Sequence, residues 1–483
     1  MQMTFDKALR SQKCSARRVV RLSPRNARPT FFFDFRSDWS FGRKVQPSFN
    51  GVREFHNQTF DAQLEQIAKR AGRPLTAVEM DFIWLAFAVY AADRFAPRHP
   101  FGPNGTSFWR RRLHVRVPMR ERQLWANVEP KLVRALEMLT EDDWTFDFSG
   151  DRASFSVEMQ GHFRRFEHSD IHWVSLFSGG LDSLAGALHW LLRQPGRGLL
   201  VSGQTHSRMQ AAQELLVKNL SGEFPDRIDH AGVQYGFPEK QELSGVESSQ
   251  RARAFVHVCL GALAALTVGN SRLFLFENGI GAFNLSCDTA QIGSQNSRGT
   301  HPVFLSRMEN YVSTVFGKRF AIENPFTFST KGQMLGFAPL AQYEQLLQQS
   351  FSCDRFPNYH HRAPQCGYCP SCLIRRLAFH ASGLPDSPEG YSVDLFDLNR
   401  SMRPGELTPL TKLSIQADVL ATRLSTAQPW QELYANWPDL FSAEREIGAP
   451  GFSKNVRILL KRHVAEWRSF SAAMAANFLA AAA

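Results

Sequence analysis

Segments with the apolar pattern of β-strands alternate with segments of helical periodicity from about residue 170 to residue 276. IHWVSLF, GRGLLVSG and RLFLFE are strand-like, and SLAGALHWLLRQ and QRARAFVHVCLGALAALTVG have the spacing of helices. Strands that alternate with helices of roughly 10–15 residues are joined by right-handed crossovers and form a parallel sheet with helices on both faces. The sequence therefore predicts an α/β fold, in which ligands bind at the carboxyl ends of the strands.

The 483 residues are enough for several domains, and we predict four parts. They are a basic N-terminal arm at 1–55, an α+β accessory domain at 56–165, a nucleotide-binding α/β domain at 166–383 and a helical C-terminal region at 384–483. Within the accessory domain, we interpret the segment DDWTFDFSGDRASFSVEM as a hairpin. Only the third part contains motifs from which a chemistry can be inferred.

The formal net charge of +11 is concentrated at the N-terminus, because residues 1–50 carry 11 Lys and Arg against three Asp and Glu. The local charge is thus +8, and the remainder of the chain carries only +3, which argues against a broad nucleic-acid-binding face. We predict that the basic arm contacts nucleic acid or an acidic protein partner. The alternative is an arm that is merely solvated.

The sequence also bears on the compartment. No segment approaches the roughly 18 consecutive apolar residues of a membrane-spanning helix, and the N-terminal segment lacks the apolar region of a secretory signal. Seven cysteines in 483 residues do not form the dense disulfide framework of a small secreted domain. We therefore expect a cytoplasmic protein with no membrane partner.

The stretch SLFSGGLDSLAGAL, residues 175–188, places a short polar turn between a predicted strand and a predicted helix. Gly179 and Gly180 can adopt positive φ and let a ligand approach the backbone. The helix begins near Leu181, and its first amides have no intrahelical acceptors, so that an anion is favoured beside them. We therefore predict a phosphate-binding turn, although the lysine of the common phosphate loop is absent.

Three polar side chains refine this prediction. Ser178 begins the turn, and Ser183 can donate its hydroxyl to a phosphate oxygen. Asp182 is unsuited to an anion on its own, but a metal ion that bridges the carboxylate to phosphate removes the conflict. The alternative is an ordinary strand–helix turn with a serine cap. The pattern S-G-G-x-D-S favours phosphate binding because it combines all these features.

A second motif is a cluster of cysteines with the spacing C-x12-C-x2-C-x2-C. Its members are Cys353, Cys366, Cys369 and Cys372. Four thiolates form a closed tetrahedral zinc site, which leaves no position for catalysis and stabilises the fold. His360 and His361 lie inside the loop and could replace Cys353 as ligands. The closely spaced pairs could instead have a redox role, or the four cysteines could hold an iron–sulfur cluster.

Together, the two motifs resemble the QueC family, the 7-cyano-7-deazaguanine synthases, whose phosphate loop is that of the N-type ATP pyrophosphatases. Three further stretches support the resemblance: SGQTHSRMQAAQEL, SSQRARAFVHVCLGALAA and FSTKGQML. The similarity spans about 170 to 382. It implies a PP-loop core, that is, a Rossmann-like parallel sheet of the adenine-nucleotide alpha hydrolase type, with a structural zinc site.

The resemblance implies that ATP, Mg²⁺ and Zn²⁺ are cofactors, and it assigns residues to them. The residues expected to contact the nucleotide and its magnesium are Ser178, Gly179, Gly180, Asp182, Ser183, Gln204 and His206. Asp182, Lys331 and Arg251 are the expected catalytic residues, since the two cations can neutralise phosphate charge in the transition state. Arg251 could instead hold the substrate carboxylate, and both cations could be ordinary solvated side chains at helix starts. Glu277 and His206 are weaker candidates, because Glu277 could merely end a strand and His206 could merely cap a helix.

The chain also departs from the family. The usual enzyme is about half as long, Ala252 follows Arg251 where the family has asparagine, and FENGIGAFNLSCDTAQIGSQNSRGTHPVF replaces the usual substrate loop. This enlarged form resembles the QueC-like proteins of Qat-type antiphage defence systems. That resemblance implies a protein partner encoded in the same operon.

The implied activity is adenylation of the carboxylate of a 7-deazaguanine-type small molecule, followed by attack of a nitrogen on the acyl carbon. Ammonia would give an amide and then a nitrile, whereas an amine of a partner protein would give a stable conjugate; the sequence leaves the two open. An RNA-modifying PP-loop enzyme and a non-catalytic nucleotide-binding scaffold are the alternative functions.

Overall fold

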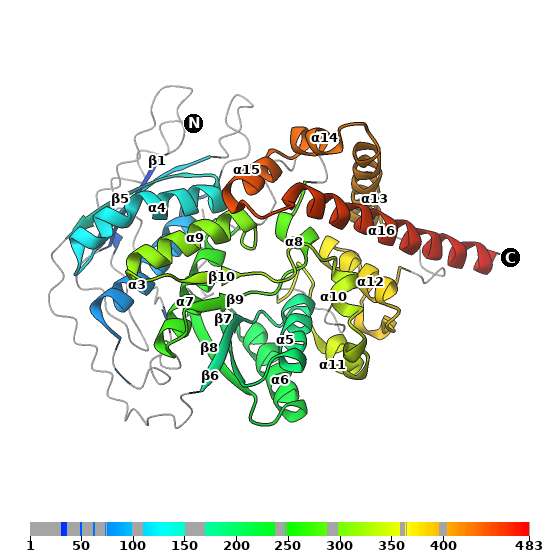
Figure 1. Ribbon diagram of the computed structural model, residues 1–483, viewed down its shortest axis with the longest axis horizontal. Coiled ribbons are helices and arrows are strands. Elements are labelled where there is room, and N and C mark those ends of the chain that lie inside the picture. Colours follow the sequence, from blue (N-terminus) through cyan, green and yellow to red (C-terminus); the bar gives the residue numbers. More distant parts are fainter. Residues whose placement is uncertain are drawn as a thin grey trace, which may run out of the picture.

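The computed structural model describes residues 30–35, 49–50, 61–62, 73, 75–98, 110–149, 170–236, 247, 249–286, 298–357, 363, 365–395 and 403–482. The described chain forms two β-sheets with helices between and around them (Figure 1). It is a mixed α/β protein, and the predicted parallel sheet is present.

The larger sheet has six strands in the order β10-β9-β6-β7-β8-β3. The strands are β3 (Asp61–Ala62), β6 (Ile171–Leu176), β7 (Arg197–Gln204), β8 (Ile228–Gly236), β9 (Arg272–Phe274) and β10 (Ala321–Glu323). All of them pair in parallel except β3, which is antiparallel to β8. The chain proceeds from β6 to β7 in one direction and from β9 to β10 in the other. The order therefore reverses between β6 and β9, at the point where open α/β sheets bind ligands.

Helices cover both faces of this sheet. They are α5 (Leu181–Arg193), α6 (Ser207–Glu223), α7 (Arg253–Thr267) and α9 (Pro302–Val315). Because side chains alternate along a strand, Trp173 of β6 packs in the cluster that contains α5 and α6, whereas Val174 packs in the cluster that contains α7 and α9. The other elements that precede the C-terminal region are α8 (Gly279–Phe283), α10 (Lys331–Leu335), η2 (Ala338–Tyr343), α11 (Glu344–Gln349), α12 (Pro370–Ser382) and η3 (Pro388–Gly390).

The smaller sheet has the order β2-β1-β4-β5. Its strands are β1 (Thr30–Phe35), β2 (Phe49–Asn50), β4 (Arg112–Pro118) and β5 (Asp143–Ser149), accompanied by α3 (Ala77–Arg94) and α4 (Arg122–Thr140). Among the residues described, β5 pairs in parallel with β4, to which α4 connects it. The second strand of the predicted hairpin lies in 150–169, outside the described residues.

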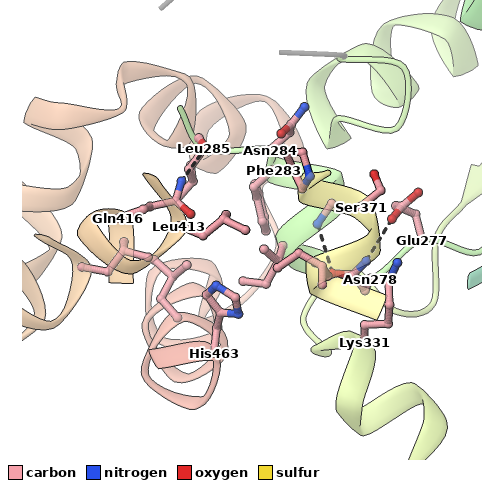
Figure 2. A pocket seen from close by; sticks show the side chains of 17 residues that line it. Glu277, Asn278, Phe283, Asn284, Leu285, Lys331, Ser371, Leu413, Gln416 and His463 are labelled. Carbon is pink, nitrogen blue, oxygen red and sulfur yellow. Dashed lines mark hydrogen bonds between the residues drawn. The ribbon is translucent and has the colours of Figure 1, made fainter. Parts of the chain in front are cut away.

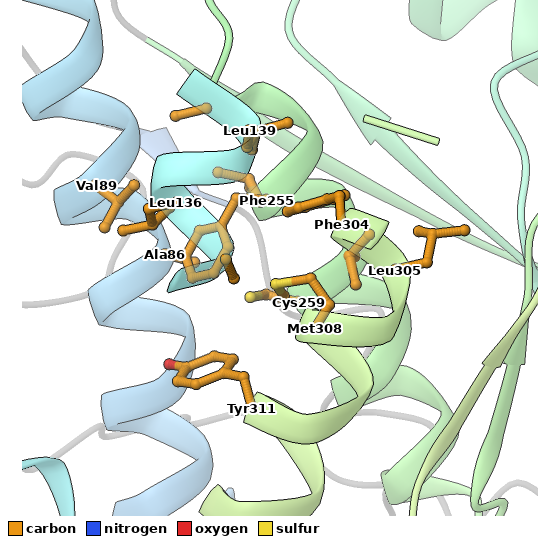
Figure 3. Close-up of a cluster of buried hydrophobic side chains, with 14 of the residues drawn as sticks. Ala86, Val89, Leu136, Leu139, Phe255, Cys259, Phe304, Leu305, Met308 and Tyr311 are labelled. Carbon is orange, nitrogen blue, oxygen red and sulfur yellow. The ribbon is translucent and has the colours of Figure 1, made fainter. Parts of the chain in front are cut away.

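The helix α3 is buried around its whole circumference, as expected of a helix that is apolar on every side. Figure 3 shows where it meets its neighbours: Ala86 and Val89 of α3 lie beside Leu136 of α4, with Phe255 of α7 in the same cluster. The segments predicted as an accessory domain and as a nucleotide-binding domain therefore share one hydrophobic core.

The C-terminal region is helical, as predicted. It consists of α13 (Pro404–Leu424), α14 (Pro429–Asn436), α15 (Pro438–Ile447) and α16 (Phe452–Ala482). In Figure 1, α13 and α16 lie on the side of the molecule where α8, α10 and α12 follow the large sheet, and α16 packs against α8, α12 and α13. Among the helices described here, none combines the length and apolarity needed to cross a membrane.

Candidate functional site

The glycine turn lies between β6 and α5, at the carboxyl edge of the large sheet. Gly179 has a φ of +81°, and a Cβ there would lie 2.4 Å from the Phe351 ring, so that only glycine fits. Gly180 is the N-cap residue of α5 and makes no side-chain cap hydrogen bond. The N-cap position of α5 is therefore glycine and not serine.

The hydroxyl groups of the turn bond to one another and to the backbone. Ser178 Oγ accepts a hydrogen bond from Gly180 N at 3.1 Å, Ser183 Oγ donates to Gly180 O at 2.9 Å, and the two hydroxyl oxygens lie 3.1 Å apart. These side chains and the start of α5 form one surface. The positive end of the α5 dipole and two hydroxyl groups suit that surface to an anion.

A cluster of buried charged side chains lies beside the glycine turn, and it includes Asp182 at the start of α5. Lys331 Nζ is 2.7 Å from Asp182 Oδ2, and the amide nitrogen of Asn278 donates to Asp182 Oδ1 at 3.1 Å and to Glu277 Oε1 at 3.0 Å. Asp182 and Lys331 are each 8% exposed. The Asp182 carboxylate thus pairs with the ammonium group of Lys331, and Asn278 bridges the carboxyl groups of Asp182 and Glu277. We call these four residues the acidic cluster.

The acidic cluster is assembled from three neighbouring strands. Asp182 follows β6, Glu277 follows β9, and Lys331 begins α10 after β10. Since β6 and β9 flank the point at which the strand order reverses, the topology itself brings the two carboxylates together. A Cβ on Gly281 would lie 2.2 Å from Glu277 Oε1, so the glycine of α8 makes room for this carboxyl group.

Burial and charge shift the pKa values of the cluster in opposite senses. Burial, followed by the nearby negative charge of Asp182, raises the pKa of Glu277 to about 8. Burial alone would lower the pKa of Lys331, but the Asp182 and Glu277 carboxyl groups outweigh it and raise that pKa above its usual value. At neutral pH, Glu277 is therefore mostly a neutral carboxylic acid, and Lys331 is charged.

The C-terminal helix α16 contacts the residue that precedes Lys331. Thr330 is the N-cap residue of α10, where Lys331 is the first helical residue, and its hydroxyl donates to Glu466 of α16 at 2.7 Å. Burial raises the pKa of Glu466 above its usual value. The contact fixes the start of α10, and through it the position of Lys331.

A cavity of about 180 Å³ opens on the other side of the acidic cluster (Figure 2). Glu277, Asn278 and Lys331 lie at one end, and Gln416 of α13 and His463 of α16 line the opposite wall. We call this space the α16 cavity. It places the helical C-terminal region in direct contact with the candidate site.

The structure places the remaining predicted residues apart from the acidic cluster. Gln204 ends β7 and is 3% exposed, and its Nε2 is buried without a hydrogen-bond partner among the described residues. His206 caps α6, where its Nδ1 accepts a hydrogen bond from Arg208 N at 3.0 Å. Arg251 lies 3.0 Å from Glu141 of the N-terminal part. The roles of these three residues in nucleotide binding or catalysis stay predictions.

The four cysteines converge on one small volume. All four Sγ atoms lie within 4.8 Å of one another, with 3.8 Å between Cys366 and Cys372 and 3.9 Å between Cys353 and Cys369. A zinc ion with four Zn–S bonds of about 2.3 Å requires sulfur–sulfur separations of about 3.8 Å. The cluster therefore fits a tetrahedral zinc ion. His360 and His361, the alternative ligands, lie outside the described residues.

The cysteine cluster is linked to the glycine turn by the segment that precedes it. Phe351 N donates to Gly179 O at 3.1 Å, and Leu181 N donates to Ser352 Oγ at 3.4 Å. Cys353 follows directly. A metal held by the four cysteines would thus fix the segment that supports the turn, which is a structural rather than a catalytic task.

The parallel α/β sheet carries the glycine turn and the acidic cluster at the carboxyl ends of its strands, where open α/β folds bind ligands. The family model described as "Queuosine biosynthesis protein QueC" matches residues 281–383, about a fifth of the chain. No curated protein matches the chain. The family match supports a QueC-like family member that uses ATP and acts in the manner of a ligase. It includes Lys331 and the four cysteines, while the glycine turn, Asp182 and Glu277 precede it.

Sequence reasoning missed Asn278, Glu141 and the two C-terminal residues Gln416 and His463. Asn278 had a local signal, because asparagine after a strand and before glycine is typical of a helix N-cap. Gln416 and His463 had none, since each lines the α16 cavity only through contacts between segments far apart in the sequence, and the contact of Glu141 with Arg251 is likewise distant in sequence.

Proposed function

We propose that the chain is a PP-loop enzyme that uses ATP to adenylate the carboxylate of a 7-deazaguanine-type acid and then forms a C–N bond. The observation that carries the proposal is the acidic cluster beside the glycine turn, with Asp182 and Lys331 2.7 Å apart. The QueC match to the adjoining residues 281–383 supports the same activity.

The glycine turn is proposed to hold the β- and γ-phosphates of ATP. The first amides of α5 and the hydroxyl groups of Ser178 and Ser183 supply donors, and the glycines let the phosphates approach the backbone. Asp182 would hold Mg²⁺, which usually takes one or two carboxylates together with substrate phosphates and supplies positive charge to the transferring phosphate. Lys331, in contact with Asp182, is proposed to neutralise charge on the α-phosphate.

The first step joins a carboxylate oxygen of the acid to the α-phosphorus, while the bond from that phosphorus to the bridging oxygen breaks and pyrophosphate leaves. In the second step a nitrogen attacks the acyl carbon, the carbon–oxygen bond to AMP breaks, and the nitrogen loses a proton to a base. Conversion of the resulting amide to a nitrile would consume a second ATP, because the amide oxygen must also leave with AMP.

The nucleophile is either ammonia or an amine of a partner protein, and we favour a protein amine because the chain extends far beyond the matched residues. We propose a cytoplasmic enzyme of a Qat-type antiphage system, with a partner encoded in the same operon and with a basic N-terminal arm that contacts the partner or nucleic acid. Mass spectrometry of the protein co-expressed with its operon neighbours separates the two products. A mass added to a neighbour identifies conjugation, and free nitrile identifies the small-molecule route.

The adenylation itself is tested by incubating the protein with ATP, Mg²⁺ and 7-carboxy-7-deazaguanine. We expect release of AMP and pyrophosphate by the wild type and none by Asp182→Ala, whereas Asp418→Ala on the exposed side of α13 behaves as the wild type. Equal turnover by Asp182→Ala would remove the site assignment. Binding of ATP without any turnover would favour the scaffold alternative.

The RNA-modifying alternative meets an obstacle in Cys259. A PP-loop thiolase needs a reactive cysteine near the loop, but Cys259 is fully buried among α7 and α9 side chains (Figure 3), and burial raises its pKa well above the usual value. The other spare cysteines, Cys14 and Cys287, lie outside the described residues. RNA binding that weakens steeply with salt would favour this alternative.

We also propose that the cysteine cluster holds zinc. Metal analysis of the purified protein is expected to give about one zinc ion per chain, and Cys372→Ser is expected to lose the metal and much of the stability, because zinc binding and folding are coupled. A protein that is stable and metal-free after purification, with the four thiols titratable, would contradict the proposal.

A further inference from the structure

The α16 cavity has a charged end and an otherwise uncharged lining. Lys331 and Glu277 lie at the charged end, close to Asp182. Away from that end, the lining consists mainly of aliphatic and aromatic side chains, including Phe283, Leu413 and Leu460. A ligand that fits must therefore present a charged group to Lys331 and keep an uncharged body between apolar walls, since a buried charge without a partner is strongly disfavoured.

His463 gives this lining a specific polar group. The side chain is 3% exposed and lines the cavity, and Figure 2 shows its ring turned from α16 towards the other lining side chains. Within the described chain, it has no hydrogen-bond partner. Burial lowers its pKa to about 4, so the ring is neutral at neutral pH and offers one donor and one acceptor.

Gln416 of α13 gives the cavity a second polar group. Its Nε2 donates to Leu285 O at 2.7 Å, which fixes the orientation of the amide. The Oε1 atom has no hydrogen bond to a described residue, and the side chain is 6% exposed. Two neutral polar groups, both without a full set of partners, thus face a largely apolar space. Such groups favour a ligand that supplies the missing hydrogen bonds.

The size of the cavity limits the body of the ligand. An apolar protein cavity of about 150 Å³ accepts benzene, and this one measures about 180 Å³. A flat ring system with polar atoms on its edge satisfies both the volume and the two polar groups, whereas an aliphatic chain would leave His463 and Gln416 without partners.

We propose that α13 and α16 complete the substrate site, with His463 and Gln416 binding the polar edge of an uncharged heteroaromatic ring whose carboxylate points to Lys331. The helical C-terminal region is then a specificity wall of the enzyme, built from residues outside the segment that matches the QueC family. The inference rests on the proposed function, because the carboxylate it orients is the one to be adenylated.

The test measures binding of 7-carboxy-7-deazaguanine to the full chain by calorimetry. His463→Phe keeps the ring volume and removes both polar edges, so we expect the dissociation constant of the acid to rise about tenfold, the factor for one lost hydrogen bond. His463→Asn, which retains a donor and an acceptor, should lose less. The matched control is Lys461→Phe on the exposed side of α16, which should bind as the wild type does.

ATP affinity, measured on the same samples, shows whether each variant retains the folded nucleotide site. His463→Phe with unchanged affinity for the acid would overturn the inference. Failure of the wild type to bind the acid, while ATP still binds, would also overturn it, because the ligand class would then be wrong.

Hydrogen exchange on the wild type gives a test that needs no variant. Addition of the acid is expected to slow amide exchange in α13 and α16, and exchange slowed only by a peptide amine from a partner would assign the cavity to the nucleophile instead. The two proposals fail differently. If pyrophosphate release and binding of the acid do not depend on His463, while pyrophosphate release still depends on Asp182, the proposed function stands and the proposed role of α13 and α16 is wrong. If binding of the acid depends on His463 but turnover is unaffected by Asp182→Ala, the cavity binds the acid as proposed and the assignment of the adenylation site is wrong.

Discussion

The molecule contains two buried charge clusters of opposite design. In the N-terminal part, Arg98 and Arg111 pair with Asp93 and Asp142, and all four side chains are at most 1% exposed. This balanced cluster has two positive and two negative charges. The acidic cluster, in contrast, contains two carboxyl groups, those of Asp182 and Glu277, and only one basic group, the ammonium group of Lys331.

The two clusters also differ in the hydrogen bonds and opposite charges that their buried groups receive. Arg111 donates to both aspartates and to the backbone oxygen of Asp93, and the two aspartates raise its pKa although burial opposes them. Glu277 has no guanidinium partner of this kind, and burial, followed by the negative charge of Asp182, raises its pKa. A balanced buried network stabilises a particular packing, whereas an unbalanced one beside an anion-binding turn is suited to bind a cation and phosphate.

The largest effect is expected from breaking the balanced cluster. Arg111→Met leaves two buried aspartates short of their partner, so the free energy of unfolding should fall by about 3–5 kcal/mol. Chemical denaturation measures this loss. Pyrophosphate release per folded molecule should remain near the wild-type value, and a large loss of activity with unchanged stability would contradict the division between the clusters.

Breaking the acidic cluster should have the converse effect. Lys331→Met removes the charge proposed to neutralise the transferring phosphate, and we expect pyrophosphate release to fall by about 10²–10³-fold. The loss of stability should be smaller than for Arg111→Met, since Asp182 keeps its hydrogen bond from Asn278 and Glu277 holds its proton. Steady-state kinetics and denaturation of the same preparation measure both. Full activity of Lys331→Met would show that the cluster is structural.

The raised pKa of Glu277 predicts a pH dependence. Because this carboxyl group holds its proton in the folded state up to a pKa of about 8, against about 4.5 when unfolded, its contribution to stability is present below pH 4.5 and is lost as the pH rises to 8. Glu277→Gln should remove that part of the slope, which amounts to at most about 1.4 kcal/mol per pH unit. Denaturation at a series of pH values checks this. Parallel curves for wild type and variant would contradict the assignment.

The smallest effect is expected from a substitution of Glu466, which contacts Thr330 at the start of α10. Glu466→Gln weakens the acceptor for the Thr330 hydroxyl and so loosens the start of α10. As a positioning residue, Glu466 should affect kcat by a few-fold while the KM for ATP stays constant. A change in KM alone would show that Glu466 acts on nucleotide binding and not on the position of Lys331.

The sequence was sufficient for features that are local in the chain. The alternation of strands and helices predicted the parallel sheet, and the glycines predicted the turn before α5, because periodicity and backbone freedom act over a few residues. The close spacing of three of the cysteines likewise predicted their cluster.

Features that depend on distant contacts could not be predicted from the residues alone. Asp182 and Lys331 are far apart in sequence and meet only because β6, β9 and β10 are neighbours in the sheet. The pair between Arg251 and Glu141 joins two parts that were expected to be separate domains. The position of α13 and α16 at the α16 cavity could not be predicted from the sequence for the same reason, since amphipathic helices do not indicate which surface they cover.

The most direct test of the central claim follows oxygen atoms through the reaction. The acid is prepared with ¹⁸O in its carboxylate and incubated with ATP, Mg²⁺ and a nitrogen donor, and the AMP is analysed by mass spectrometry. If the acidic cluster catalyses adenylation, AMP gains one ¹⁸O atom from the acid, and Asp182→Ala yields none. Unlabelled AMP, or ADP in its place, would contradict the account.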